Sequence, residues 1–491
     1  MNAINDIGFG TIILGLIYII NVFLIFAVIF IERKSPTATF AWILFLAFVP
    51  VIGFFVYIII NQNWARYQIN KMTSSEEYVF EEALDYQIEN IDSSVINSDK
   101  SYLQKWLSLI KLNQVYGKGI FLSGNDVKLI TDGKEFLDDL IFEISNAHKS
   151  ICMEFFIMRW DEVGQKIIKL LTEKVKEGVE VRLLLDSQGS HQINNYKINE
   201  YLDAGGKIGY FFQPKLHKLG IKFDTKLNYR NHRKIVVIDD KLAYTGGFNL
   251  GREYIGKKEK FGYWRDAFIK IKGNSILPLK LRFVLDWRFT VKEQINIIES
   301  DFKLSLSNKG TDMQIVSCGP EEPKEEIKRG FMKMITLSEK SIYIQTPYFV
   351  PDASLLESLK MACLSGIEVN IMIPSIPDHL FVYWATYSYI GELLRDGAHV
   401  YIYDNGFLHA KTIVCDEEVC SIGSCNFDRR SFKLNFETNA FIYDPNIACK
   451  LLDSFKKDLE HSHELTYSDY LKRNKIIKFK EAISRLLSDI L

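Results

Sequence analysis

The stretch NHRKIVVIDD (Asn231–Asp240) decides the fold, because its pattern returns later in the chain as LHAKTIVCDE (Leu408–Glu417). Each stretch contains histidine, lysine and aspartate in the spacing His-x-Lys-x-x-x-x-Asp. The first triplet is His232, Lys234 and Asp239, and the second is His409, Lys411 and Asp416. A chain with nine histidines is not expected to match so long a pattern twice by chance. The repetition therefore indicates a duplicated structural unit.

The sequence on both sides of the two motifs repeats as well. A glycine follows each histidine after fourteen residues and an asparagine after seventeen; these are Gly246 and Asn249 in the first copy, and Gly423 and Asn426 in the second. Short β-branched and apolar runs alternate with amphipathic segments before each motif. In the first copy these runs are KSICMEFFIM (149–158), EGVEVRLLLD (177–186) and AGGKIGYF (204–211). In the second copy they are KSIYIQTPYF (340–349), SGIEVNIMIP (365–374) and DGAHVYIY (396–403).

This order of strands and helices predicts an α/β protein made of two fused lobes that are related by a pseudo-twofold axis. The first lobe is expected over residues 116–300, with its motif region at 227–254. The second is expected over residues 301–491, with its motif region at 404–431. Residues 65–115 are polar and acidic, and we expect them to form a linker or a solvated connecting helix.

Side-chain alternation separates the roles of the three motif residues. Each motif runs into a β-branched segment, KIVVI or KTIVC, which predicts a buried strand. On a strand, His232 and Lys234 share one face, and so do His409 and Lys411. The aspartates, Asp239 and Asp416, follow their histidines by seven residues and fall at the end of the strand. They are therefore expected to fix the strand end instead of orienting the histidines.

Two lobes that meet about a pseudo-twofold axis would bring both histidine–lysine pairs to one pocket. The lysines would supply positive charge and the asparagines neutral donors, which suits an anionic phosphodiester. One neutral imidazole could attack phosphorus while the other, protonated, donates to the leaving oxygen. No carboxylate cluster with the spacing of metal ligands is apparent, so the sequence predicts neither a metal nor another cofactor.

The N-terminal region contains two apolar stretches, each long enough to cross a bilayer. The first, between Asp6 and Glu32, is IGFGTIILGLIYIINVFLIFAVIFI; the second, at 39–60, is TFAWILFLAFVPVIGFFVYIII. A cleaved signal peptide is the alternative for the first stretch, but no basic segment precedes it. We expect residues 1–64 to form a two-helix transmembrane hairpin that anchors a multi-pass protein in the cell membrane.

Overall composition restricts the partners and the compartment. Lys plus Arg is 60 and Asp plus Glu is 61, whereas a chain that binds nucleic acid is usually clearly basic. We therefore expect no nucleic-acid partner. The seven cysteines are odd in number and form no C-x-x-C pair, which favours a reducing compartment and places the body on the cytoplasmic face.

The motifs resemble those of the phospholipase D superfamily, and in finer detail those of bacterial cardiolipin synthases. The segments that carry the resemblance span the chain and are ERKSPTATFAWILFLAFVPVIGFFVYIII (32–60), YRNHRKIVVIDDKLAYTGGFNLGREYIG (229–256), YWRDAFIKIKG (263–273), QTPYFVPD (345–352) and SCNFDRRSFKLNFE (424–437). Asn61 departs from the glycine expected there, which affects nothing catalytic. A hydrolytic phospholipase D anchored in the membrane remains the alternative within the same superfamily.

The resemblance implies a reaction in which phosphatidylglycerol is both donor and acceptor of a phosphatidyl group. His232 would be the nucleophile and His409 the general acid and later the base. Lys234 and Lys411 would hold the phosphate. Glu253 and Glu437 follow the two motifs, and we expect them to orient the histidines.

Two basic segments predict contact with an anionic membrane surface. FFQPKLHKLGIKFDTKLNYR (211–230) interleaves lysines with apolar residues just before the first motif. YLKRNKIIKFKEAISRLLSDIL (470–491) reads as a basic amphipathic helix. Both are expected to lie against lipid headgroups, although a solvated loop is the alternative for the first.

Overall fold

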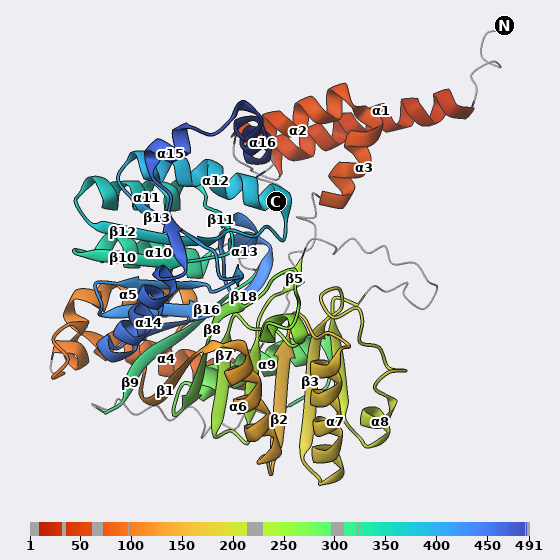
Figure 1. Ribbon diagram of the computed structural model, residues 1–491. Coiled ribbons are helices and arrows are strands. Elements are labelled where there is room, and N and C mark those ends of the chain that lie inside the picture. The colour runs from red at the N-terminus through yellow and green to blue at the C-terminus, as the bar shows by residue number, and fades with distance from the viewer. Residues whose placement is uncertain are drawn as a thin grey trace, which may run out of the picture. The chain divides into compact units, whose positions relative to one another are not determined.

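The computed structural model describes residues 9–31, 36–60, 72–96, 98–213, 229–295, 309–321, 324–486 and 488 (Figure 1). The chain folds as two units. One contains residues 1–67 with 214–229, and the other, called the body, contains residues 68–213 and 230–491. The predicted lobe boundary near residue 300 and most of the basic segment at 211–230 lie outside the described residues.

The N-terminal unit contains three apolar helices, α1 (Phe9–Phe30), α2 (Pro36–Phe48) and α3 (Pro50–Ile60). Within the described residues, α1 alone is long and apolar enough to cross a membrane. The second predicted span is divided at Pro50, because proline has no N–H to continue the helical ladder. The expected hairpin of two full-length spans is therefore not confirmed.

Helix α1 supports the break between α2 and α3. Asn21 is buried on α1, and its Nδ2 donates to the carbonyl oxygen of Leu46 at 3.2 Å and to that of Pro50 at 2.9 Å. In an unbroken helix the oxygen of Leu46 would accept from the N–H of residue 50, which proline lacks. Asn21 thus replaces a backbone donor where no water would reach in a membrane.

The body contains a duplicated sheet. In the first half the strands are β1 (Leu122–Asp132), β2 (Ser150–Phe155), β3 (Glu180–Asp186), β4 (Lys207–Phe211), β6 (Ile235–Ile238), β7 (Leu242–Gly246) and β8 (Trp264–Lys272). In the second half they are β9 (Thr311–Cys318), β10 (Ser341–Gln345), β12 (Glu368–Pro374), β13 (His399–Tyr403), β15 (Thr412–Cys415), β16 (Val419–Gly423), β18 (Asn435–Tyr443) and β19 (Ser462–Glu464).

The two halves have matching strand orders. The first runs β4-β3-β2-β6-β7-β8-β1, and the second runs β13-β12-β10-β15-β16-β18-β9, with β19 added beside β13. Strands β1 and β9 pair antiparallel and join the halves. Strands β2, β3 and β4 are parallel, as are β10, β12 and β13, which agrees with the predicted α/β class.

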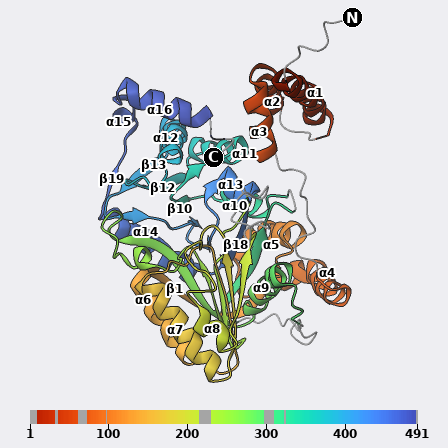
Figure 2. The same ribbon diagram turned by 90° about the vertical axis from the view of Figure 1, so that its right-hand side faces the viewer.

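Helices cover both faces of the strands. Those of the first half are α6 (Gly133–Ser145), α7 (Glu162–Lys176), α8 (Asn199–Asp203) and α9 (Ile276–Val291). Those of the second half are α10 (Glu326–Leu337), α11 (Ala353–Leu364), α12 (Leu380–Arg395), α13 (Arg429–Lys433) and α14 (Pro445–Leu459). Figure 2 shows α6 and α7 on one side of the first-half strands and α9 on the other. Each half thereby encloses its own apolar core.

The segment predicted as a linker belongs to the body. It forms α4 (Ser74–Ile96) and α5 (Leu103–Gly117). Trp106 on α5 is fully buried in the core of the second half, and its Nε1 donates to Glu418 at 2.8 Å. Phe80 and Leu84 on α4 are buried too. The prediction of a solvated connection was wrong, because one apolar stripe among many charges was enough to anchor each helix.

The basic C-terminal segment forms α15 (Tyr467–Leu471) and α16 (Lys475–Leu486) instead of one helix. Helix α16 packs on α12 through its polar side, where Glu481 is buried and receives two hydrogen bonds of 2.7 Å from Arg473. Its apolar residues Ile476, Phe479 and Leu486 face outward. In a helix that packs into the core of a soluble protein, the apolar side faces the core and the polar side faces solvent.

Candidate active site

A cavity of about 660 Å³ is lined by residues from both halves of the body. His232 and His409 both line it, and so do Asn249 and Asn426. The structure therefore brings together at one cavity the two histidines that the sequence predicts to act jointly.

Each motif begins with a short strand that pairs with a strand of the opposite half. Strand β5 (Arg230–Asn231) pairs with β18 of the second half, and β14 (Phe407–Leu408) pairs with β8 of the first. The N–H of His232 donates to the carbonyl of Phe436 at 2.9 Å, and that of His409 donates to the carbonyl of Arg265 at 2.7 Å. These crossings hold both histidines at the junction of the halves.

The crossing gives each histidine a carboxylate from the opposite half. Nδ1 of His232 lies 2.9 and 3.0 Å from the two carboxylate oxygens of Glu437, and Nδ1 of His409 lies 2.6 Å from Asp266. A carboxylate at Nδ1 holds the proton there and leaves the lone pair on Nε2. Both side chains are buried but line the cavity, so Nε2 is the nitrogen that can meet a substrate.

The buried environment keeps the imidazoles neutral. Burial lowers the pKa of His232, although Glu437 opposes the change. Burial and then Lys411 lower the pKa of His409 to about 4, against the influence of Asp266. The two carboxylates remain ionised, because the neighbouring histidine and lysine outweigh burial and hold their pKa values below the usual range. A neutral imidazole on an ionised carboxylate is a nucleophile or a proton acceptor.

The lysines lie beneath the histidines. Nζ of Lys234 donates to the backbone oxygen of His232 at 2.6 Å, and Lys411 makes the same bond to His409. Burial lowers the pKa of Lys234 to about 7 and that of Lys411 to about 8. Both lysines are buried, and neither is among the residues that line the cavity.

The glycines and asparagines of the repeat have separate tasks. A Cβ on Gly246 would lie 2.4 Å from the carbonyl oxygen of Ala267, and one on Gly423 would lie 2.2 Å from a side-chain oxygen, so both glycines permit close strand packing. Asn249 accepts from the N–H of Ile157 at 3.0 Å, and its side chain is also hydrogen-bonded to Tyr254. Both asparagines are suited to donate to phosphate oxygens at the cavity wall.

The motif aspartates close hairpins, as the sequence predicted. Asp239 accepts from the N–H groups of residues 148, 149 and 150 at 2.8, 2.7 and 2.9 Å. Asp416 accepts from residues 339, 340 and 341, each at 2.8 Å. Both have positive φ, 54° and 53°, in the tight turn after their strand. Neither contacts a histidine side chain within the described part of the chain.

Glu253 does not orient a histidine, so this prediction was wrong. Its carboxylate accepts from Arg159 at 3.1 Å and from Lys258 at 2.7 Å. The residue that the prediction missed is Asp266. Asp266 is the third residue of β8, and Glu437 is the third residue of the equivalent strand β18. Aligning these two strands of the repeat would have identified it.

Comparisons with known proteins identify the family of this chain. The model of a family described as "Cardiolipin synthase, PLD-like domain" matches residues 140–261 and 331–459. "Major cardiolipin synthase ClsA" of Bacillus subtilis is 45% identical over 483 residues, which covers 98% of this chain and 99% of that protein. The chain belongs to the cardiolipin synthase family. Another member, "Cardiolipin synthase" of Staphylococcus aureus, is 44% identical and covers 96% of this chain and 95% of its own length.

Two further matches concern the anchor and the fold. A family described as "Phospholipase_D-nuclease N-terminal" matches residues 19–60 of this member of the cardiolipin synthase family. A crystal structure of phosphatidylserine synthase from Haemophilus influenzae aligns with a TM-score of 0.61 at 16% identity. It covers 78% of this chain and 97% of that one, and it supports the same fold for the body.

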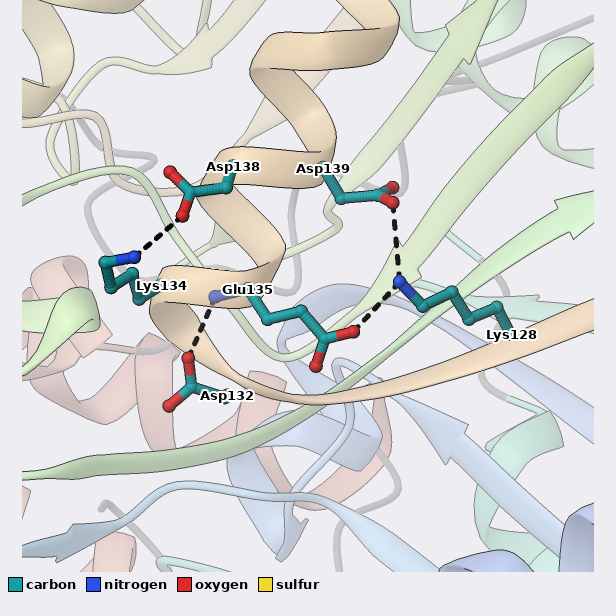
Figure 3. Close-up of a pocket in the computed structure, with 6 residues that line it drawn as sticks. All are labelled: Lys128, Asp132, Lys134, Glu135, Asp138 and Asp139. Carbon is teal, nitrogen blue, oxygen red and sulfur yellow. Dashed lines mark hydrogen bonds and ion pairs between the residues drawn. The ribbon is translucent and has the colours of Figure 1, made fainter.

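A second pocket of about 440 Å³, at the start of α6, is only a charged surface (Figure 3). Lys128 lies 2.9 Å from Glu135 and 3.4 Å from Asp139, and Lys134 lies 3.0 Å from Asp138. These groups form ion pairs with one another, and the four carboxylates of the pocket outnumber its two lysines. Among the described residues, no group of three or more His, Cys, Asp or Glu side chains is arranged to hold a metal ion.

The role of Asp416 leads to a stability prediction for this member of the cardiolipin synthase family. Its side chain is fully buried and also pairs with Lys105. Asp416→Asn is expected to lower the free energy of unfolding by about 2–4 kcal/mol, because one partner of a buried, hydrogen-bonded ion pair is lost. Chemical denaturation measures this, and kcat of the folded fraction should stay within about threefold. A fall in kcat without lost stability would contradict the structural role.

Proposed function

We propose that this chain transfers a phosphatidyl group from one phosphatidylglycerol to another, giving cardiolipin and glycerol. The observation that carries the proposal is the pair of cavity-lining histidines, each held by a carboxylate of the opposite half. The relatives that cover nearly the whole chain bear the name cardiolipin synthase, which supports this substrate class. The reaction exchanges one phosphodiester bond for another of similar energy, so it needs no nucleotide.

In the first step His232 attacks phosphorus of the donor through Nε2. A P–N bond forms, the P–O bond to glycerol breaks, and the glycerol oxygen takes a proton from His409. The phosphate anion raises the pKa of the imidazole that it approaches, so His409 can carry this proton in the filled cavity.

In the second step the terminal hydroxyl of another phosphatidylglycerol replaces glycerol. It gives its proton to His409, its oxygen bonds to phosphorus, and the P–N bond breaks to restore neutral His232. Lys234 and Lys411 beneath the cavity, with Asn249 and Asn426 in its wall, would offset the charge of the transition state. A hydrolytic phospholipase D would use the same groups, with water in place of the lipid alcohol.

The body would meet its substrates at an anionic membrane surface. Ile476 and Phe479 on α16 are each 66% exposed, beside Lys475 and Lys478 on the same helix. Leu380 at the start of α12, which packs on α16, is 64% exposed and also lines the cavity. Exposed apolar side chains with lysines around them suit a lipid interface. A lipid lying there would reach the cavity without leaving the membrane surface.

The N-terminal unit would anchor this cytoplasmic body in the cell membrane. Helix α1 would supply one span, and α2 with α3 would supply a second, broken span in which Asn21 bonds the carbonyl oxygen of Leu46. Nucleic acid is not expected as a partner, since the net charge of the chain is −1.

The buried lysines predict a pH dependence. A lysine is charged below its pKa, so Lys234 and Lys411 lose their charge as pH rises through about 7 and 8. kcat/KM for phosphatidylglycerol, which reports the free enzyme, should therefore begin to fall near pH 7 and fall further above about pH 8. Lys234→Arg, whose guanidinium stays charged, should shift this fall upward. A flat kcat/KM between about pH 7 and pH 9 would contradict the assigned role.

Purified protein supplied with phosphatidylglycerol in liposomes tests the proposed reaction. Cardiolipin and glycerol in equal amounts are the expected products. Phosphatidic acid in place of cardiolipin would identify a hydrolase. The absence of any turnover would indicate a protein that only binds phospholipid.

A further inference from the structure

The two halves differ in chemistry at positions that the repeat makes equivalent. Seven residues after the first residue of β2 and of β10 stand Ile157 in the first half and Tyr348 in the second. Ten residues after the first residue of β3 and of β12 stand Ser190 and Asp378. Ser190 is buried and donates to the backbone, whereas Tyr348 and Asp378 line the cavity. The second half therefore presents a phenol and a carboxylate to the cavity where the first half presents an isoleucine.

Tyr348 and Asp378 lie on the side of the cavity that holds His409. Strands β10 and β15 pair antiparallel, so the chain that leaves the end of β10 passes beside the start of β15, where the second motif lies. Strand β12 is parallel to β10 and ends at the same edge, which brings the loop with Asp378 there as well. Burial lowers the pKa of Lys411 to about 8, and Asp378 is one of the carboxylates that oppose this change. The carboxylate is thus close enough to act on the second motif.

Asp378 differs from the two other carboxylates that line the cavity, Glu253 and Asp428, in the partners it has. Glu253 is held by two cations at 3.1 and 2.7 Å, and Asp428 caps helix α13. Asp378 accepts one hydrogen bond on each oxygen, from the hydroxyl of Tyr348 and, at 2.7 Å, from the N–H of His379. It forms no ion pair within the described ranges of the chain, and a carboxylate with two bonds keeps further lone pairs. Its oxygens can therefore accept from a ligand.

The proposed reaction places an alcohol on this side of the cavity. Attack on phosphorus and departure of the leaving oxygen are in line, so glycerol leaves opposite His232, toward His409. The incoming alcohol that displaces His232 enters by the same face. In both steps the carbon next to the reacting oxygen carries a hydroxyl, because the leaving glycerol and the glycerol of the acceptor lipid share their central 2-hydroxyl. One hydrogen-bond acceptor beside His409 would serve both steps.

We propose that Asp378, positioned by Tyr348, accepts a hydrogen bond from the 2-hydroxyl of the glycerol headgroup and so selects glycerol as the alcohol. This inference rests on the proposed transfer reaction and names the side chain that recognises the headgroup. An alcohol without that hydroxyl takes the carboxylate out of water and gives it no donor, which is unfavourable. A hydroxyl is favoured over an ammonium group, because the carboxylate already attracts the positive charge of Lys411 nearby.

The test offers two soluble alcohols to the enzyme at once, with phosphatidylglycerol as the donor. Labelled glycerol and labelled 1,3-propanediol are supplied at equal concentration, and the two labelled lipid products are counted. Both alcohols have a pair of equivalent primary hydroxyls, but glycerol alone has the central one. The ratio of the products reports selection and does not depend on the amount of folded protein. Wild-type protein should favour glycerol by about 10- to 100-fold, as expected for a hydrogen bond to a charged group.

Four variants locate the selection. Asp378→Ala should reduce the preference for glycerol to less than about threefold, because the charge-assisted bond is lost. Asp378→Asn keeps an oxygen that accepts but lacks the charge, so it should retain part of the preference. Tyr348→Phe removes the bond that positions Asp378 and should lower the preference by a smaller factor than Asp378→Ala. Glu253→Gln is the matched control, because it neutralises a cavity carboxylate whose partners are cations, and it should keep the wild-type ratio.

The outcomes separate this inference from the proposed function. Equal use of glycerol and 1,3-propanediol by wild-type protein that makes cardiolipin would overturn the inference alone, and so would an unchanged preference in Asp378→Ala. Ethanolamine, supplied in place of 1,3-propanediol, should be used less than glycerol. Its preferential use would show that the carboxylate selects a cation and would also overturn the inference. Protein that forms neither cardiolipin nor labelled phosphatidylglycerol would refute the proposed function and this inference with it.

Discussion

Asp266→Asn is expected to lower kcat for cardiolipin formation by about 10³- to 10⁴-fold with little change in KM. Asp266 lies 2.6 Å from Nδ1 of His409 and keeps the proton on that nitrogen. An asparagine amide can donate to Nδ1 and so favour the tautomer with its proton on Nε2. That imidazole can neither accept the proton of the incoming hydroxyl nor carry a stabilised charge, and a wrong tautomer of this kind costs about 10⁴-fold in other enzymes.

Glu437→Gln should have an effect of the same size through His232, and the matched control is Glu253→Gln. Glu253 also lines the cavity, but its partners are Arg159 and Lys258 instead of a histidine. We therefore expect Glu253→Gln to change kcat by less than about tenfold. Asp266→Glu, which keeps the carboxylate, should recover part of the loss if orientation is the cause. Equal losses for all three acids would contradict the assignment of Asp266 and Glu437.

The repeated motifs predict most of the fold and half of the site. The β-branched runs after His232 and His409 predict buried strands, and matched strands in both halves follow from duplication. The odd spacing to Asp239 and Asp416 places them at strand ends, where the structure finds them. Local rules suffice for these features because each depends on residues close in sequence.

Features that depend on contacts across the two halves could not be read from local pattern. Each histidine pairs with an acid on a strand of the other half. A search for acids near each motif in the sequence therefore selected Glu253 instead of Asp266. Helix α5 shows the same limit, because Trp106 and Leu109 pack into a core formed by residues more than about two hundred positions later in the sequence. The break between α2 and α3 could be predicted in part, because the sequence has a proline, Pro50, inside the second apolar stretch.

His232→Ala should abolish the reaction, with kcat reduced by about 10⁴-fold or more, because removal of a nucleophile leaves only the binding groups. In the unaltered protein, phosphorus-labelled phosphatidylglycerol followed by rapid alkaline quench should leave label on a histidine, since phosphohistidine survives base. Peptide mapping is expected to place it at His232. Its Nε2 lies on the cavity side while Glu437 and the carbonyl of Ser424 hold Nδ1 at 2.9 and 3.1 Å.

His409→Ala separates the two histidines. It removes the proton donor and acceptor but leaves the nucleophile, so the labelled adduct should still form at His232, slowly, and then persist because no base activates the second alcohol. His232→Ala should give no adduct at all. Label that maps to His409, or an adduct in His232→Ala, would reverse the order of the two residues.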